Sequence, residues 1–176
     1  MRKFSLAVLV VVLSLSAYRV VVFAFDSPEG GFSVKMPGKP LFQQIHHKSF
    51  VGDVKENTYT LKTKTEEYSV SYTQLPGIAT TFESDQALFN KAKDGFVKDT
   101  GADEVSYGKF PFNGKQGREL VFKIDATDKS EVTTGKARFF LFDKILYVVT
   151  ASTTRGVKGG AVVDQFLDSF KLMPHS

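Results

Sequence analysis

The residues best suited by type to bind a metal ion are the adjacent histidines His46 and His47, with Asp53 six positions further on. Imidazole and carboxylate groups are ordinary ligands of Zn²⁺. The pair lies in a stretch that we expect to be extended, and successive side chains of a strand point to opposite faces of the sheet. Neither histidine has a partner at the helical spacing i, i+4. Exposed polar residues on an edge strand or loop are therefore the leading interpretation, and a metal site at His46 and His47 is the alternative.

A second candidate is the stretch 153–160, with the sequence TTRGVKGG, which runs into the last expected helix. A helix N-terminus offers unpaired amide N–H groups and partial positive charge, and both favour anions. Glycines let a ligand approach the backbone, and basic side chains add charge. The predicted site for an anion or a partner segment consists of Arg155, Lys158, Gly159 and Gly160. Its spacing matches no phosphate-binding loop, so a loop whose glycines serve turn geometry is the leading interpretation.

Groups for hydrolytic catalysis are missing from the sequence. It contains no cysteine and no Gly-x-Ser-x-Gly motif, and the only histidine outside positions 46 and 47 is His175, in the C-terminal tail. The neighbouring carboxylates Glu66 and Glu67 diverge in a strand or turn, so they cannot face each other across a substrate. We predict no catalytic residue, no cofactor and no enzymatic activity.

The first 24 residues have the order of a secretory signal, with a basic start, an apolar run and small residues at the end. Cleavage fits after Ala17 or after Ala24, and Ala24 is preferred because it also removes the apolar residues 20–23. An uncleaved anchor is the alternative, although Arg19 interrupts an apolar stretch that is shorter than the roughly 20 residues of a spanning helix. In either case we expect an exported protein, periplasmic or extracellular.

The remaining residues, 25–176, have a nearly balanced charge. They contain 20 Lys and Arg against 19 Asp and Glu, so net charge does not favour nucleic acid or an anionic membrane as a partner. The absence of cysteine excludes disulfides, thiolate metal sites and a lipidated cysteine. With enough length for one core and no repeat or linker, this part is predicted to form a single domain.

Alternating apolar and polar residues predict a chain rich in strands. The expected strands are 32–36, 41–51, 59–64, 68–72, 105–110, 119–124, 132–142 and 145–151. Two helices are expected as well. The first follows the N-cap Ser84 and ends at Gly101, and the second carries an apolar stripe from Val162 to Phe170.

The last two of these strands form the clearest hairpin, with its turn at Asp143 and Lys144. Both of its faces are apolar, since Phe139 on one face is followed by Phe140 on the other. A strand that is apolar on both faces is covered on both faces. We therefore expect this hairpin at the centre of a sheet, with other elements packed on each side and the last helix as one cover.

Three segments in order resemble the PsbP-like family. They are GFSVKMP at 31–37, ARFFLFDKILYVVTA at 137–151 and FLDSFKL at 166–172. That family includes the extrinsic proteins of photosystem II and related exported bacterial proteins. The resemblance implies an α+β fold with a central antiparallel β-sheet flanked by helices, an α/β/α sandwich. It also implies a scaffold, assembly factor or chaperone-like adaptor. The chain lacks a clear counterpart of the N-terminal extension through which the photosystem subunit engages its partner, so a photosynthetic role is not implied.

Export, the missing catalytic groups and this resemblance together lead to one functional hypothesis. We expect a non-enzymatic binding or assembly module of the cell envelope, whose partner is another envelope protein. The alternative is a small-molecule or metal-binding periplasmic protein with a pocket between sheet and helices. No nucleic-acid partner is expected, a membrane contact is expected only through an uncleaved signal segment, and the oligomeric state is left open.

Overall fold

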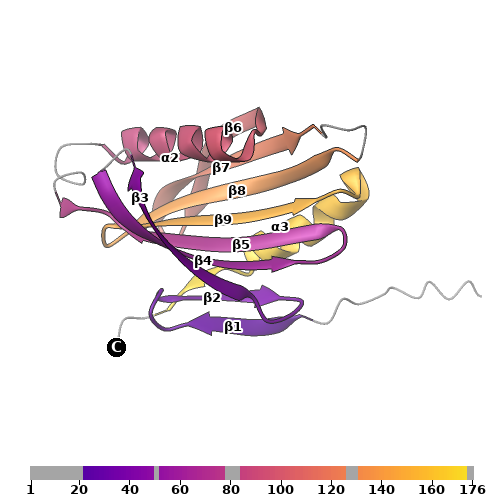
Figure 1. Cartoon of the computed structure of the whole chain (residues 1–176), viewed down its shortest axis with the longest axis horizontal. Helices are drawn as coiled ribbons and strands as arrows, with labels where there is room; N and C mark the ends of the chain where they lie inside the picture. Colours follow the sequence, from indigo (N-terminus) through magenta and orange to yellow (C-terminus); the bar gives the residue numbers. More distant parts are fainter. Residues whose placement is uncertain (1–21, 50–51, 78–83, 126–130, 174–176) are drawn as a thin grey trace, which may run out of the picture.

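The computed structural model describes residues 22–49, 52–77, 84–125 and 131–173, without the side chains of His47, Ser49 and Val157. Two antiparallel sheets carry the fold (Figure 1). The large sheet has the order β3-β4-β5-β9-β8-β7-β6 and the small one the order β1-β2-β10. The strands of the large sheet are β3 (Leu41–Ser49), β4 (Gly52–Lys62), β5 (Glu66–Gln74), β6 (Asp103–Phe112), β7 (Lys115–Ile124), β8 (Thr133–Phe142) and β9 (Ile145–Thr153). The small sheet consists of β1 (Phe23–Ser27), β2 (Phe32–Met36) and β10 (Lys171–Leu172).

Three helical segments complete the described part of the chain. They are α2 (Asp85–Thr100), the short 3₁₀ helix η1 (Gly156–Gly159) and α3 (Gly160–Asp168). None of the helices in the described ranges has the length and apolar character needed to cross a membrane.

The hairpin of β8 and β9 occupies the centre of the large sheet, as the two apolar faces predict. Asp143 and Lys144 connect the strands with φ angles of 48° and 65°, the left-handed pair that a tight two-residue hairpin turn requires. Phe139 is buried toward α2, and Phe140 is buried on the opposite side. The prediction that this hairpin is covered on both faces is therefore confirmed.

Helix α2 covers one face of the sheet, over β7 and β8. Its N-cap is Ser84, whose Oγ accepts a hydrogen bond of 3.3 Å from the Ala87 N–H, and its C-cap is Gly101 at φ 66°. Both ends are those predicted from the sequence. Leu88 and Phe89 are buried against a cluster that includes Leu120, Phe122, Ala137, Phe139 and Leu146.

The opposite face is covered by α3 together with the small sheet. Phe32, Val34 and Met36 of β2 are fully buried and pack in one cluster with α3 and the inner residues of β5, β8 and β9. Helices α2 and α3, on opposite faces of the antiparallel sheet, confirm the predicted α+β class. The small sheet is a finding that the expected sandwich of helices did not include, because β1 and β10 are short and have little alternation of their own.

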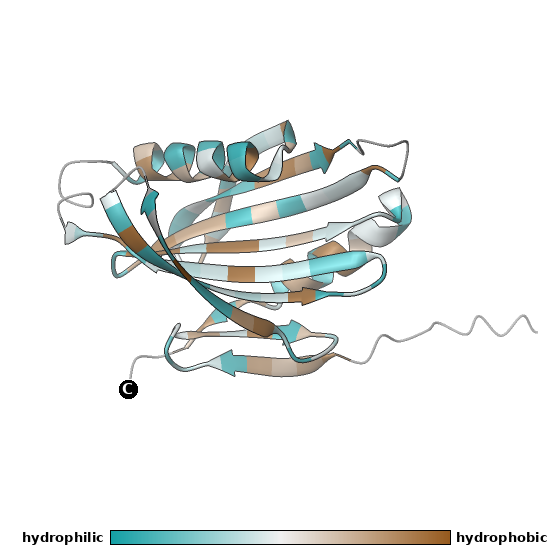
Figure 2. Ribbon diagram, viewed as in Figure 1, coloured by the Kyte–Doolittle hydropathy of each residue, from teal (hydrophilic) through white to brown (hydrophobic). Residues whose placement is uncertain are grey.

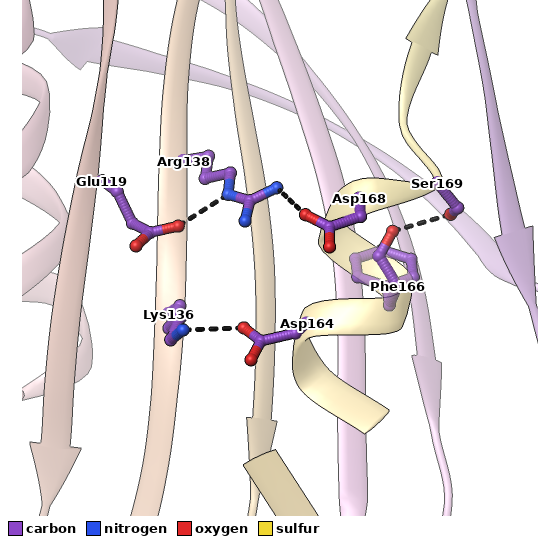
Figure 3. Close-up of polar contacts among 7 residues, drawn as sticks. All are labelled: Glu119, Lys136, Arg138, Asp164, Phe166, Asp168 and Ser169. Carbon is purple, nitrogen blue, oxygen red and sulfur yellow. Dashed lines mark hydrogen bonds and ion pairs between the residues drawn. The ribbon is translucent and has the colours of Figure 1, made fainter. Parts of the chain in front are cut away.

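Polar contacts from the central strand β8 hold α3 on this face (Figure 3). Arg138 of β8 donates from Nε to Glu119 at 2.7 Å and from Nη1 to Asp168 at 2.8 Å, and its guanidinium lies 4.0 Å from the ring centre of Phe110. One turn earlier on α3, Asp164 accepts a 2.7 Å hydrogen bond from Lys136. Each of these charged groups is paired with another one in the cluster. The cluster therefore serves to hold α3 against the sheet.

Candidate functional site

The predicted anion site before α3 is a packed loop whose main cation has a partner. Arg155 Nη2 forms an ion pair with Glu66 Oε1, and Glu66 itself is largely buried. The backbone N–H of Arg155 donates at 3.1 Å to Oγ1 of the buried Thr153. The guanidinium is thus held by β5 through an internal contact.

The two glycines of this loop differ in their surroundings. A Cβ added at Gly159 would lie 2.8 Å from Thr153 Cβ, whereas one at Gly160 would meet no atom within 4 Å. Gly159 is therefore required by its close packing against Thr153. Lys158 is exposed. Anion or partner binding by Arg155, Lys158, Gly159 and Gly160 stays a prediction.

The histidines predicted as metal ligands lie on β3, at the edge of the large sheet. His46 is exposed and opposite Lys55, and His47 is opposite Val54, so the alternation of the strand assigns them to different faces. Across the described residues, no group of three or more His, Asp or Glu side chains is arranged to hold a metal ion. Since the His47 side chain is outside the described part, the metal site also stays a prediction.

The most accessible apolar surface lies along β3. Leu41 is 80% exposed, Phe42 is 51% exposed and Ile45 is 43% exposed. One side of β3 pairs with β4 over nine consecutive residues without a register shift, and no strand of the described ranges pairs with its other side. An edge strand of this kind presents a row of free backbone N–H and C=O groups, which is a template for another strand.

The other edge of the same sheet, β6, is protected. Its pairing with β7 shifts register between Glu104 and Ser106, and it contains Lys109 and Pro111. Bulges, lysines and prolines on an edge strand are the usual devices that prevent a further strand from adding. β3 contains neither proline nor a bulge along its nine pairs. We name the outer side of Leu41–Ser49 the β3 edge.

Charged residues gather at the far end of the β3 edge. Lys48 is opposite Asp53 and His46 is opposite Lys55, so all four residues share one face of the hairpin. Together with Val54 they line an open hollow of about 510 Å³. We name the hollow lined by His46, Lys48, Asp53 and Lys55 the basic hollow, because two lysines face one aspartate there.

A wider groove runs beside α2, on the face of the sheet that α2 covers. Apolar side chains of β7 to β9 lie under α2, but the next strand, β5, presents Ser69, Ser71 and Thr73. Ser71 Oγ is 2.8 Å from Thr58 Oγ1 of β4. Burial of hydroxyl groups gives little hydrophobic stabilisation, and α2 does not cover this part of the sheet. A groove of about 750 Å³ is left beside the helix. We name it the hydroxyl groove.

Comparison with solved structures shows the fold. The solution structure of cyanobacterial PsbP (CyanoP) from Synechocystis sp. PCC 6803 superimposes with a TM-score of 0.60 at 14% sequence identity, covering 89% of this chain and 95% of that one. The chain has the PsbP-like fold. A protein of unknown function from Pseudomonas aeruginosa, PA94, described as a putative regulator, matches with a TM-score of 0.47 at 11% identity, covering 87% of this chain and 98% of that one.

Sequence comparison gives no further relative. No protein-family model matches the chain, and no curated protein sequence matches it. The PsbP-like fold therefore supports the resemblance seen in the three sequence segments and says nothing by itself about a partner.

The sequence predicted an edge strand or loop at His46 and His47, but it indicated neither the exposed apolar side chains of the β3 edge nor the hydroxyl groove. The apolar residues of β3 are visible in the sequence, but Leu41 and Phe42 read as core residues unless the strand is known to be at the edge. The serines and threonines of β5 alternate with Tyr68, Val70 and Tyr72, and this alternation was used only to predict a strand. It could have indicated that one face of β5 is open.

Proposed function

We propose that this protein is a non-enzymatic, exported binding module that takes up a protein partner by strand addition at the β3 edge. The observation that carries the proposal is the contrast between the two edges of one sheet. β6 has a bulge, Lys109 and Pro111, whereas β3 has neither bulge nor proline, carries its one lysine, Lys48, near its far end, and exposes Leu41, Phe42 and Ile45. In strand addition the main chain supplies affinity and alternate side chains supply specificity.

The PsbP-like fold supports this proposal at a coarse level, because it is consistent with an extrinsic binding protein. Among the described residues, no group of three or more His, Asp or Glu side chains could hold a metal ion. A partner from the cell envelope follows from the signal-like first 24 residues.

A crosslinking pull-down from the envelope of the source cell, read by mass spectrometry, tests the proposal. The variant carries Leu41→Lys and Ile45→Lys, since lysines on an edge strand oppose strand addition. The matched control is Val105→Lys, because Val105 is 60% exposed on the other edge. Lys158→Ala tests the loop before α3.

We expect a specific partner that is captured by the wild type and by Val105→Lys but is lost from the β3 variant. A partner retained by the β3 variant and lost from Lys158→Ala places the contact at the loop and overturns strand addition. The absence of any specific partner in all four samples overturns the binding module itself.

A small-molecule binder is the second candidate, and the hydroxyl groove favours it. Its volume of about 750 Å³ lies within the range of roughly 300–1,000 Å³ that is usual for ligand sites. Thermal-shift screening tests it, because a ligand at 100 times its dissociation constant adds about 2.7 kcal/mol of stability. A ligand whose shift is abolished by Ser71→Phe would lie in the groove. Zn²⁺ in the same assay, with and without His46→Ala, tests the metal alternative.

A further inference from the structure

We propose that the partner segment at the β3 edge carries carboxylate side chains that enter the basic hollow, and an apolar side chain that covers Phe42. This inference rests on the proposed function, strand addition to β3. It names the chemistry by which one extended protein segment is recognised and others are rejected.

The polarity of β3 changes along its length. The strand is hydrophobic where it begins, at Leu41 and Phe42, and hydrophilic where it ends, at His46 to Lys48 (Figure 2). It contains no Asp or Glu. A partner strand lying along it therefore meets apolar side chains at one end and basic side chains at the other.

The residues that would contact the partner's side chains share one face of the sheet. Phe42, Gln44, His46 and Lys48 alternate with the other face, and Lys55 joins them from β4. Phe42 already packs on Tyr59, with ring centres 4.9 Å apart, yet half of its surface is exposed. One further apolar group can thus extend this contact. Opposite charges directly across a strand pair stabilise it, and like charges destabilise it.

The charge balance of the basic hollow gives the sign of the partner. Lys48 and Lys55 face Asp53, which leaves one positive charge without counting His46. On the neighbouring face, Glu56 lies opposite Ile45 and accepts a 3.3 Å hydrogen bond from the Thr58 hydroxyl, and only the backbone of His47 is described. A partner carboxylate near Lys48 and Lys55 neutralises the remaining positive charge, whereas a partner lysine would lie next to two like charges.

The spacing of these residues fixes the spacing in the partner. Phe42 and Lys48 are six residues apart, which is about 20 Å along a strand at 3.3 Å per residue. In an antiparallel partner, the carboxylates opposite Lys48 and His46 come first, and the apolar residue follows six and four positions later. The recognised pattern is acidic, any, acidic, three of any kind, apolar.

A second copy of this chain does not fit the pattern. Antiparallel pairing of β3 with itself about its centre, Ile45, places Leu41 opposite Ser49 and Phe42 opposite Lys48. The apolar end of each copy would then lie against the basic end of the other, with no carboxylate from either strand. The edge is therefore complementary to a different, acidic segment.

Synthetic peptides test the inference on the full chain, expressed from its complete coding sequence and purified as the cell processes it. The acidic peptide is Thr-Glu-Thr-Glu-Val-Thr-Thr-Phe-Val, which places glutamates opposite Lys48 and His46 and phenylalanine opposite Phe42 when antiparallel. The basic control has both glutamates replaced by lysine. Fluorescence anisotropy gives the dissociation constants, and chemical shifts of the β3 amides locate the contact.

We expect the acidic peptide to bind at least about five-fold more tightly than the basic one, because Lys48 and Lys55 attract glutamates and repel lysines, with the difference reduced in 0.5 M NaCl. The double variant Lys48→Glu, Lys55→Glu should reverse the preference. Lys109→Glu, on the β6 edge, should leave it unchanged. A reversal of preference cannot arise from misfolding, because it requires the β3 variant to bind the other peptide.

Each other outcome is decisive. Equal binding of both peptides, or a preference that survives the double variant, overturns the carboxylate assignment. If neither peptide binds while the pull-down partner still depends on Leu41 and Ile45, the assignment fails and strand addition stands. Loss of the dependence on β3 in the pull-down removes the proposed function itself. Sedimentation that shows a dimer abolished by Ile45→Lys assigns the edge to a second copy.

Discussion

The phenol of Tyr147 donates a 2.9 Å hydrogen bond to the backbone carbonyl of Gly30. Tyr147 lies on the central strand β9, and Gly30 lies in the turn between β1 and β2, 117 positions away along the chain. The bond is buried, so it joins the small sheet to the centre of the large one where water does not compete. It is a direct link between the two sheets.

Replacing this hydroxyl should weaken the link without leaving a cavity. We expect Tyr147→Phe to lower the free energy of unfolding by about 1 kcal/mol or somewhat more, because the Gly30 carbonyl loses a buried donor. Urea unfolding followed by circular dichroism measures the change. Tyr72→Phe, on the neighbouring strand, is the control, and an equal effect of both would contradict a specific role for the Gly30 contact.

Stability should fall at alkaline pH because of three tyrosines. Burial raises the pKa of Tyr68, Tyr107 and Tyr147 to about 12, from 10 in the unfolded chain. The stability that these buried neutral phenols contribute is complete below pH 10 and is lost as the pH rises toward about 12. In that range the unfolded chain has released phenol protons that the folded chain still retains. Urea midpoints between pH 9 and pH 12 measure this. A flat profile would contradict it, and Tyr147→Phe should reduce the slope.

The loss of Arg138 should cost more stability than the loss of its partner Asp168. The side chain of Arg138 is 7% exposed, whereas that of Asp168 is 64% exposed. We expect Arg138→Met to cost about 3 kcal/mol, near the lower limit for a buried pair that loses one partner. Asp168→Asn should cost less than about 1 kcal/mol, as a surface pair does. Urea unfolding of both variants tests the order, and a larger loss from Asp168→Asn would contradict it.

The two glycines before α3 provide a matched pair. Gly159→Ala should destabilise by about 1–3 kcal/mol, because the new Cβ overlaps Thr153. Gly160→Ala should be neutral or stabilise by up to about 1 kcal/mol, since its Cβ meets open space in the first turn of a helix. Thermal melts measure both. Equal effects would contradict the expectation that contact with Thr153 is the reason why position 159 needs a glycine.

The position of β1 bears on signal cleavage. Phe23 and Ala24 pair with Met36 and Lys35, so cleavage after Ala24 would remove two of the five residues of β1. Cleavage after Ala17 leaves β1 whole. For a chain whose first residues are removed as a signal, we therefore expect Tyr18 as the first residue, in place of the Phe25 that the sequence pattern alone favours, and the intact mass measures this. A chain that begins at Phe25 would show that β1 forms with three residues only.

Features set by neighbours in the chain were predictable. Ser84 and Gly101 are correct helix ends because a cap depends on atoms within one turn. The turn at Asp143 and Lys144 and the burial on both sides of β8 and β9 follow from patterns within twenty residues. The same reasoning applies to Asn113-Gly114, a hairpin signal at φ 48° and 75° that was present in the sequence and was not used.

The candidate site depended on pairing that no local pattern contains. Leu41, Phe42 and Ile45 are typical core residues by type, and they are exposed because β3 is the last strand of the order β3-β4-β5-β9-β8-β7-β6. Arg155 resembles a free cation in the sequence but meets Glu66, 89 positions earlier. The sequence by itself determined the helices, the central hairpin and the α+β class through short-range periodicity and capping. Tertiary structure alone decided which strand is an edge and which charge has a partner, because hydrogen-bond ladders and ion pairs form between segments far apart in the chain.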